Sequence, residues 1–256
     1  MKVTILGCGG ASGVPGISMG WGACDPNEPR NQRRRSSILV EDGDTRILVD
    51  STPDLRDQLL DAGIRIIDGL IYTHDHADHL HGIDDLREIN RVTRQWLPVW
   101  AKAEVLETAR QRFGYAFEPM ESIGEIVYRP LLTANVIDGA FRIGDIPVVP
   151  FDQDHGYSRT LGLRFGNFAY STDVVEIPEE SFKSLEGVEV WVIGCLVDYP
   201  HATHAHVEKA LEWIERVRPR RAILTHMGTR LDYQTLCRTL PPWVEPAYDG
   251  MIIEVS

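Results

Sequence analysis

The chain has 256 residues, enough for one large domain with a substantial core. Its formal net charge of −12 argues against an extended nucleic-acid surface, because Lys and Arg drive phosphate binding. The four cysteines show no paired spacing, which favours free thiols in a reducing compartment. No apolar stretch approaches the roughly 18 residues of a transmembrane helix. We therefore expect a cytoplasmic protein without membrane association, and, since no linker is visible, a single domain over residues 1–256.

The first half of the chain is predicted to alternate strands and helices. A strand over 2–6 leads into the glycine-rich loop 7–16, which lacks the Gly-Lys-Ser/Thr ending of a phosphate-binding P-loop. Two further strands are predicted at 36–41 and 45–50, and the turn signal Asp-Gly-Asp joins them. The predicted elements that follow are a helix from Asp50 to Leu60, a strand at 69–72, a helix at 83–94, a strand at 98–100 and a helix at 104–113. The helix at 83–94 should bury Ile83, Leu86, Ile89 and Val92.

The second half is predicted to be richer in strands. A strand is expected around 126–130, followed by strands at 146–151, 160–165, 167–171, 188–195, 221–225 and 251–255. Helices are expected at 178–185, 206–216 and 232–240. The helix at 206–216 is amphipathic, so its apolar face should pack on a sheet.

Residues 73–79 (Thr-His-Asp-His-Ala-Asp-His) concentrate three histidines and two aspartates directly after an apolar run. The run predicts a buried strand, and His74 and His76 would point to the same side of its extended end. Imidazoles and carboxylates this close together are ligands for zinc, manganese or iron. A solvated turn is the ordinary alternative, but buried histidines without a ligand would destabilise the fold. The stretch therefore predicts a metal site.

Other predicted strands end in the same kinds of side chain. His155 follows the strand at 146–151, Asp173 follows the strand at 167–171, and His226 directly follows the strand at 221–225. A single histidine of this kind is most often an ordinary polar residue. Several strand-end His and Asp positions in one chain favour a common cluster.

The sequence resembles the metallo-β-lactamase superfamily, whose pattern is H-x-H-x-D-H followed by His, Asp and His at later strand ends. The matching residues are His74, His76, Asp78, His79, His155, Asp173 and His226. The resemblance implies an α/β fold, namely a four-layer αββα sandwich, and two divalent metal ions. It implies His74, His76 and His155 for one ion, Asp78, His79 and His226 for the other, and a bridging Asp173. Such ions lie roughly 3.5–4 Å apart and hold a nucleophilic hydroxide.

The start of the chain indicates a branch of the superfamily. Both glyoxalase-type thioesterases and phosphodiesterases share all seven ligands, but residues 7–15 and 34–37 resemble the branch of PhnP-like cyclic phosphodiesterases and the tRNA 3′-processing endonuclease. That branch implies a histidine that protonates the leaving alkoxide, which aligns with His204. His201 or His206 could take this role instead. Asp78, as a ligand of the second ion, and His204 are the expected catalytic residues.

The implied function is hydrolysis of a small anionic phosphodiester, either a cyclic ribose phosphate or a nucleotide-like compound. A glyoxalase-type thioesterase, an RNA-processing phosphodiesterase and a non-catalytic module remain alternatives. Within the basic run 33–35, Arg35 is a candidate substrate contact, together with Ser36. No third, structural zinc is expected, because only Cys24 matches the family's ligands for it and Thr229 replaces the histidine. By analogy with dimeric relatives, a homodimer is one expectation for assembly.

Overall fold

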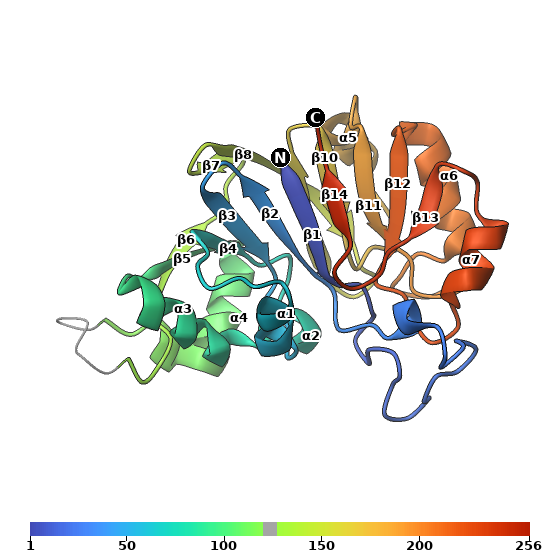
Figure 1. Cartoon of the computed structure of the whole chain (residues 1–256). Helices are drawn as coiled ribbons and strands as arrows, with labels where there is room; N and C mark the ends of the chain where they lie inside the picture. Colours follow the sequence, from blue (N-terminus) through green and yellow to red (C-terminus); the bar gives the residue numbers. More distant parts are fainter. Residues whose placement is uncertain (120–126) are drawn as a thin grey trace.

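Two seven-stranded sheets pack face to face, and helices cover their outer faces (Figure 1). The structure is a computed structural model that describes residues 1–119 and 127–256. The predicted four-layer αββα sandwich is thereby confirmed.

The first sheet has the strand order β14-β1-β2-β3-β4-β5-β6. Its strands are β1 (Lys2–Gly7), β2 (Ser37–Asp42), β3 (Thr45–Val49), β4 (Gly69–Ile71), β5 (Leu97–Ala101), β6 (Leu132–Val136) and β14 (Ile252–Glu254). Pairing is antiparallel from β14 to β3 and parallel from β3 to β6. Side chains alternate between faces, so Ile38 and Val40 join the core between the sheets while Leu39 packs beneath the helices.

The second sheet has the order β13-β12-β11-β10-β9-β8-β7. Its strands are β7 (Phe141–Ile143), β8 (Ile146–Asp154), β9 (Arg159–Phe165), β10 (Phe168–Ser171), β11 (Val190–Gly194), β12 (Arg221–Thr225) and β13 (Val244–Pro246). The strands β10 to β13 pair in parallel, and β7 to β10 pair antiparallel. Continuous burial of β10 and β11 follows from having both faces covered.

The helices lie on the two outer faces of the sandwich (Figure 1). Over the first sheet lie α1 (Leu55–Asp61), α2 (Ala77–Leu80), α3 (Leu86–Thr93) and α4 (Ala103–Phe113), and over the second lie α5 (Phe182–Leu185), α6 (Val207–Val217) and α7 (Tyr233–Thr239). Short 3-10 helices occur at Pro29–Asn31, Ile83–Asp85, Gly114–Ala116 and Glu179–Ser181. No helix in the described part of the chain is long and apolar enough to cross a membrane.

One predicted strand is misplaced. Of the strand expected around 126–130, residue 126 lies outside the described residues, and 127–130 are irregular. The strand of this region is β6, which begins at Leu132. Pro130 has no backbone N–H to donate to a neighbouring strand. The guanidinium of Arg129 donates to the carbonyl oxygen of Glu118, 2.9 Å away, which ties this segment to the chain outside the sheet. The backbone joins the sheet only after these residues.

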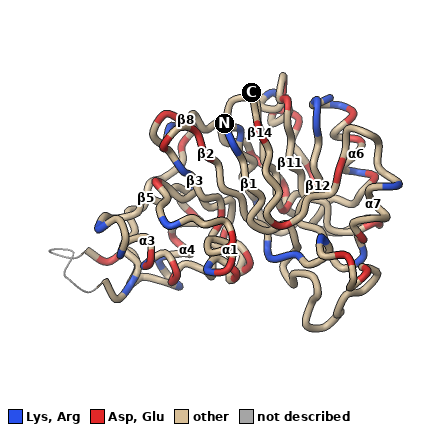
Figure 2. The backbone as a smooth tube through the Cα atoms, viewed as in Figure 1, with Lys and Arg blue, Asp and Glu red and all other residues tan. Residues whose placement is uncertain are grey.

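Charged residues are dispersed along the described chain. Figure 2 shows lysines and arginines scattered among the more numerous aspartates and glutamates. Many form ion pairs, such as Lys102 with Asp152 and Arg216 with Glu179. This distribution agrees with the expectation that no extended nucleic-acid surface exists, which stays a prediction.

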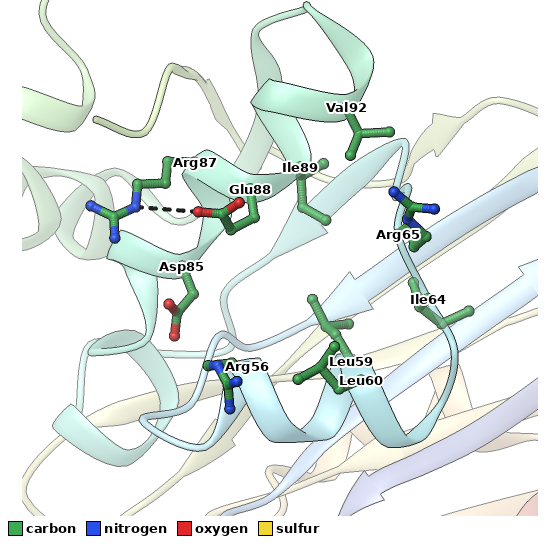
Figure 3. Close-up of a pocket in the computed structure, with 10 residues that line it drawn as sticks. All are labelled: Arg56, Leu59, Leu60, Ile64, Arg65, Asp85, Arg87, Glu88, Ile89 and Val92. Carbon is green, nitrogen blue, oxygen red and sulfur yellow. Dashed lines mark ion pairs between the residues drawn. The ribbon is translucent and has the colours of Figure 1, made fainter. Parts of the chain in front are cut away.

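A surface groove of about 430 Å³ lies between α1 and α3 (Figure 3). Its lining includes Leu60 and Val92, whose side chains are 61% and 44% exposed. The prediction that Val92 packs inward with Leu86 and Ile89 is therefore wrong for Val92. The segment 83–93 begins as a 3-10 helix and continues as an α-helix from Leu86, which rotates its last residues relative to an uninterrupted α-helix.

Candidate metal centre

The predicted ligands come together at one edge of the sandwich, where several strands end. His74 follows β4 of the first sheet, whereas His155, Asp173 and His226 follow β8, β10 and β12 of the second. In open α/β sheets, the carboxyl ends of the strands form the usual binding crevice. The two sheets therefore supply complementary halves of one site.

The ligand atoms form two groups that share one carboxylate. The first contains His74, His76, His155 and Asp173, and the second contains Asp78, His79, Asp173 and His226. Within each group, one ligand atom from every residue lies within 4.8 Å of the others. All of these residues are buried except His76, which is exposed although its ring lies against those of His74 and His155. These residues divide into the two groups that the family resemblance implies, and Asp173 belongs to both.

The arrangement fits a bound cation because its donor atoms lack partners. The Nε2 atoms of His74, His79 and His226 are buried without a hydrogen-bond partner, as is Oδ2 of Asp78. The Nε2 atoms of His79 and His226 lie 3.2 and 3.0 Å from Oδ1 of Asp173, yet neither forms a hydrogen bond of acceptable geometry. Unpaired buried polar atoms are costly. A divalent metal ion would satisfy them.

The Nδ1 atoms of three ligand histidines are held by neighbouring groups. His79 Nδ1 donates to Asp50 Oδ2 over 2.7 Å, and His155 Nδ1 donates to the carbonyl oxygen of Thr203 over 2.6 Å. His74 Nδ1 lies 3.0 Å from Oγ1 of Thr73, whose hydroxyl donates to Asp50. Such bonds fix the tautomer and leave Nε2 as the free ligand atom.

The electrostatics of the two groups differ. Burial and the neighbouring His79 hold the pKa of His74 well below its ordinary value, and burial lowers the pKa of His155 to about 4. Both rings are neutral near pH 7, as metal binding requires. Burial also lowers the pKa of His226, but the carboxylates of Asp173 and Asp78 together outweigh burial and raise that pKa to about 9. The second group thus attracts positive charge, which a divalent cation would supply.

Backbone conformation also marks the site. Five non-glycine residues in the described chain have positive φ. Arg94 and Arg218 terminate helices, where the left-handed conformation is common. The other three are Asp50 (φ 65°), Asp173 (φ 45°) and His226 (φ 56°), all in this cluster. Strained backbone of this kind persists only where the surrounding structure holds it in place, and it concentrates at functional sites.

His204 is the histidine of the segment 201–206 that reaches the cluster. Its Nε2 lies 3.4 Å from Oδ2 of Asp173, and its ring stacks on that of His226 with centroids 5.1 Å apart. Nδ1 of His204 lies 2.8 Å from Oγ1 of Thr203. His201 is one step further out, with its ring 5.2 Å from that of His204, and His206 is the N-cap residue of α6.

The candidate substrate contacts are engaged within the protein. Arg35 forms an ion pair with Asp54 over 2.8 Å and donates from Nε to the carbonyl of Ala11. Ser36 is buried, and its hydroxyl donates to the carbonyl of Gly9. Both residues hold the glycine-rich loop against the first sheet, so a contact with substrate stays a prediction for each.

The region of the possible third metal site is occupied by a different contact. The Sγ atom of Cys24 lies 3.5 Å from the carbonyl oxygen of Thr229 and is buried. Among the described residues, the two groups above are the only sets of three or more ligands arranged to hold a metal ion. The absence of a structural zinc stays a prediction.

Asp50 is the residue that sequence reasoning missed. It was expected to begin a helix, but α1 begins at Leu55, and Asp50 is a fully buried residue at the end of β3. Its carboxylate accepts bonds from the backbone N–H and the hydroxyl of Thr73 as well as from His79. The rule that located the other aspartate and histidines, a polar residue directly after an apolar strand, could have found it.

We expect Asp50→Asn to lower the affinity for metal by roughly 10–100-fold, the usual effect of removing the outer partner of a ligand. Asparagine tolerates positive φ and retains the shape of the side chain, so the fold should survive. Chelator competition at fixed metal concentration measures the change. An unaltered affinity with a lower melting temperature would assign Asp50 a purely structural role.

Comparison with known proteins places this geometry in context. The family model described as "Beta-lactamase superfamily domain" matches residues 45–227, which include all seven ligand positions. In the solved structure described as a new diphosphatase from the PhnP family, 30% of residues are identical, the TM-score is 0.91, and the match covers 100% of this chain and 98% of that one.

Two curated relatives match different lengths of the chain. An octanoyltransferase of Porphyromonas gingivalis is 32% identical over an alignment 256 positions long, which covers 98% of this chain and 51% of the relative. A ribonuclease Z of Bradyrhizobium sp. is 40% identical over 68 residues, which are 26% of this chain and 23% of the relative. The chain therefore spans about half the length of the first relative and about a quarter of the second.

Proposed function

Because the chain belongs to the metallo-β-lactamase superfamily, we propose that it is a dinuclear metal-dependent hydrolase that cleaves a small phosphodiester. The observation that carries the proposal is the pair of ligand groups sharing Asp173, with His204 beside them. Zinc or manganese suits the all-nitrogen and oxygen ligand set, with iron as a third candidate. All four cysteines are free thiols, which supports a reducing, cytoplasmic setting.

The reaction follows from the roles of the side chains. When bound, two divalent ions would act as Lewis acids toward the phosphate oxygens and make a water molecule nucleophilic near neutral pH. His74, His76 and His155 would hold one ion, and Asp78, His79 and His226 the other, with Asp173 shared. His204 has its Nδ1 fixed by Thr203 and its Nε2 on the side of the cluster. It is therefore positioned to donate a proton to the leaving alkoxide.

A diphosphate linkage is the second candidate for the bond that is cleaved. The similar PhnP-family structure is described as a diphosphatase, and the match covers nearly all of both chains. A diphosphate presents the same anionic oxygens to the metal centre but releases a phosphate, which is a better leaving group than an alkoxide. Cleavage of a diphosphate would accordingly depend less on protonation by His204.

The other two relatives motivate alternatives. The octanoyltransferase is about twice as long as the matching segment, so its named activity can reside in the part outside the match. It nevertheless makes an octanoyl thioester the appropriate probe for the thioesterase alternative. The ribonuclease Z match motivates an RNA substrate, against which the net charge of −12 argues.

A substrate panel on protein of known metal content tests the proposal. It comprises bis(p-nitrophenyl) phosphate, a cyclic ribose phosphate, a dinucleoside diphosphate, an octanoyl thioester and a precursor tRNA. We expect the highest kcat/KM for one of the small phosphodiesters. Rapid hydrolysis of the thioester without activity on any phosphate compound would overturn the proposal in favour of a thioesterase.

A further inference from the structure

Tyr157 is an exposed aromatic residue that lies two residues after a ligand of the candidate metal centre. It is 93% exposed, more than any other tyrosine or tryptophan in the described part of the chain. It occupies the turn between β8 and β9 and lies two residues after the ligand His155. Because two residues span at most roughly 7 Å, Tyr157 lies at the rim of the site. Exposing a whole aromatic ring leaves a large apolar surface in water without a gain in stability.

The backbone of this turn is fixed although the ring is free. The N–H of His155 donates to the carbonyl of Ser158 over 3.0 Å, and the N–H of Tyr157 donates to the carbonyl of His155 over 3.1 Å. The N–H of Gly156 donates to Oδ1 of Asp154 over 2.7 Å. Tyr157 is thus carried by an ordered turn. Binding of a ligand to its side chain would therefore cost the turn little backbone entropy.

The turn is packed against the segment that carries His204. Gly156 has φ +80°, and a Cβ there would lie 2.8 Å from the carbonyl oxygen of Ala202 and 2.9 Å from Cγ2 of Thr203. The rings of His155 and His204 meet edge to face with centroids 4.6 Å apart. Tyr157 therefore lies on the side of the site where His204 would protonate the leaving group.

We propose that Tyr157 is a binding residue that stacks on a planar aromatic base of the substrate, which makes base-bearing phosphodiesters the preferred class. The inference rests on the proposed phosphodiesterase function. In a nucleotide one sugar separates the base from the phosphate, so a phosphate at the metal centre brings the base to the rim. Stacking of a base on an aromatic side chain is tolerant of sequence and recurs in proteins that bind single nucleotides or strands.

The test compares two substrates that differ only in the base. Adenosine 2′,3′-cyclic phosphate carries it, and methyl riboside 2′,3′-cyclic phosphate lacks it. Tyr157→Ala should lower kcat/KM for the adenosine compound by roughly 5- to 150-fold, mainly through KM, and leave the methyl riboside compound within about twofold. Tyr157→Phe should restore wild-type values, since the ring is what stacks.

Tyr128→Ala is the matched control, because Tyr128 is also exposed (63%) and lies in the segment that precedes β6 of the first sheet. This variant should leave kcat/KM for both substrates unchanged. Equal effects of Tyr157→Ala on both substrates, or no effect on either, would overturn the stacking role while leaving the phosphodiesterase function in place. A metal-replete wild type inactive on both compounds would instead overturn the proposed function, and the stacking role with it.

Discussion

Asp173→Asn is expected to release both metal ions and to abolish hydrolysis. Asp173 is the one residue common to both ligand groups, and its carboxylate lies within 3.0–3.7 Å of ring nitrogens from five histidines, His74, His79, His155, His204 and His226. The loss of activity should exceed the roughly 10–100-fold cost of removing an outer partner of a ligand. Elemental analysis of the purified variant measures the metal content.

Asp152→Asn is the control for this variant. Asp152 lies in β8 of the same sheet but pairs with Lys102 at the surface and belongs to neither ligand group. Asparagine also tolerates the positive φ of Asp173, so Asp173→Asn should remain folded. If it retained about two ions per chain, Asp173 would not be the shared ligand, and the division into two groups would need revision.

His204→Ala is expected to lower kcat by roughly 10²–10⁴-fold and leave the metal content unchanged. The lost group is the proton donor for the leaving alkoxide, so the defect should depend on the substrate. It should be large for a cyclic ribose phosphate, whose leaving group is an alkoxide. It should be small for bis(p-nitrophenyl) phosphate, because p-nitrophenolate leaves without protonation.

His206→Ala provides the comparison, since His206 caps α6 without a hydrogen bond from its side chain. It should retain activity on both substrates. Loss of metal from His204→Ala would identify His204 as a ligand rather than a proton donor. An equal defect on both substrates would assign it a role in binding.

The strands and the clustering of the candidate ligands could be predicted from the sequence because they follow local rules. Runs such as 69–72 and 222–225 are buried on both faces, and the residues that follow them include His74 and His226. The family pattern then grouped these residues, and the resemblance to the superfamily is confirmed. The single domain and the homodimer stay predictions.

Other features depend on contacts that no local pattern contains. The position of Asp50 after an apolar strand is a local signal, but its partner His79, 29 residues later, is identified only when β3 and β4 lie side by side. The positive φ of Asp173 and His226 is imposed by the packing around them and is invisible in residue type. The ion pair of Arg35 with Asp54 is likewise absent from any local pattern, and its contact with substrate stays a prediction.

The central claim is most directly tested by titrating metal-free protein with zinc or manganese while following hydrolysis of bis(p-nitrophenyl) phosphate. We predict no activity at the start and a rise to a plateau at about two ions per chain, as expected for two ligand groups that share a carboxylate. Full activity of the metal-free protein, or inactivity on every phosphate compound at two bound ions, would contradict it.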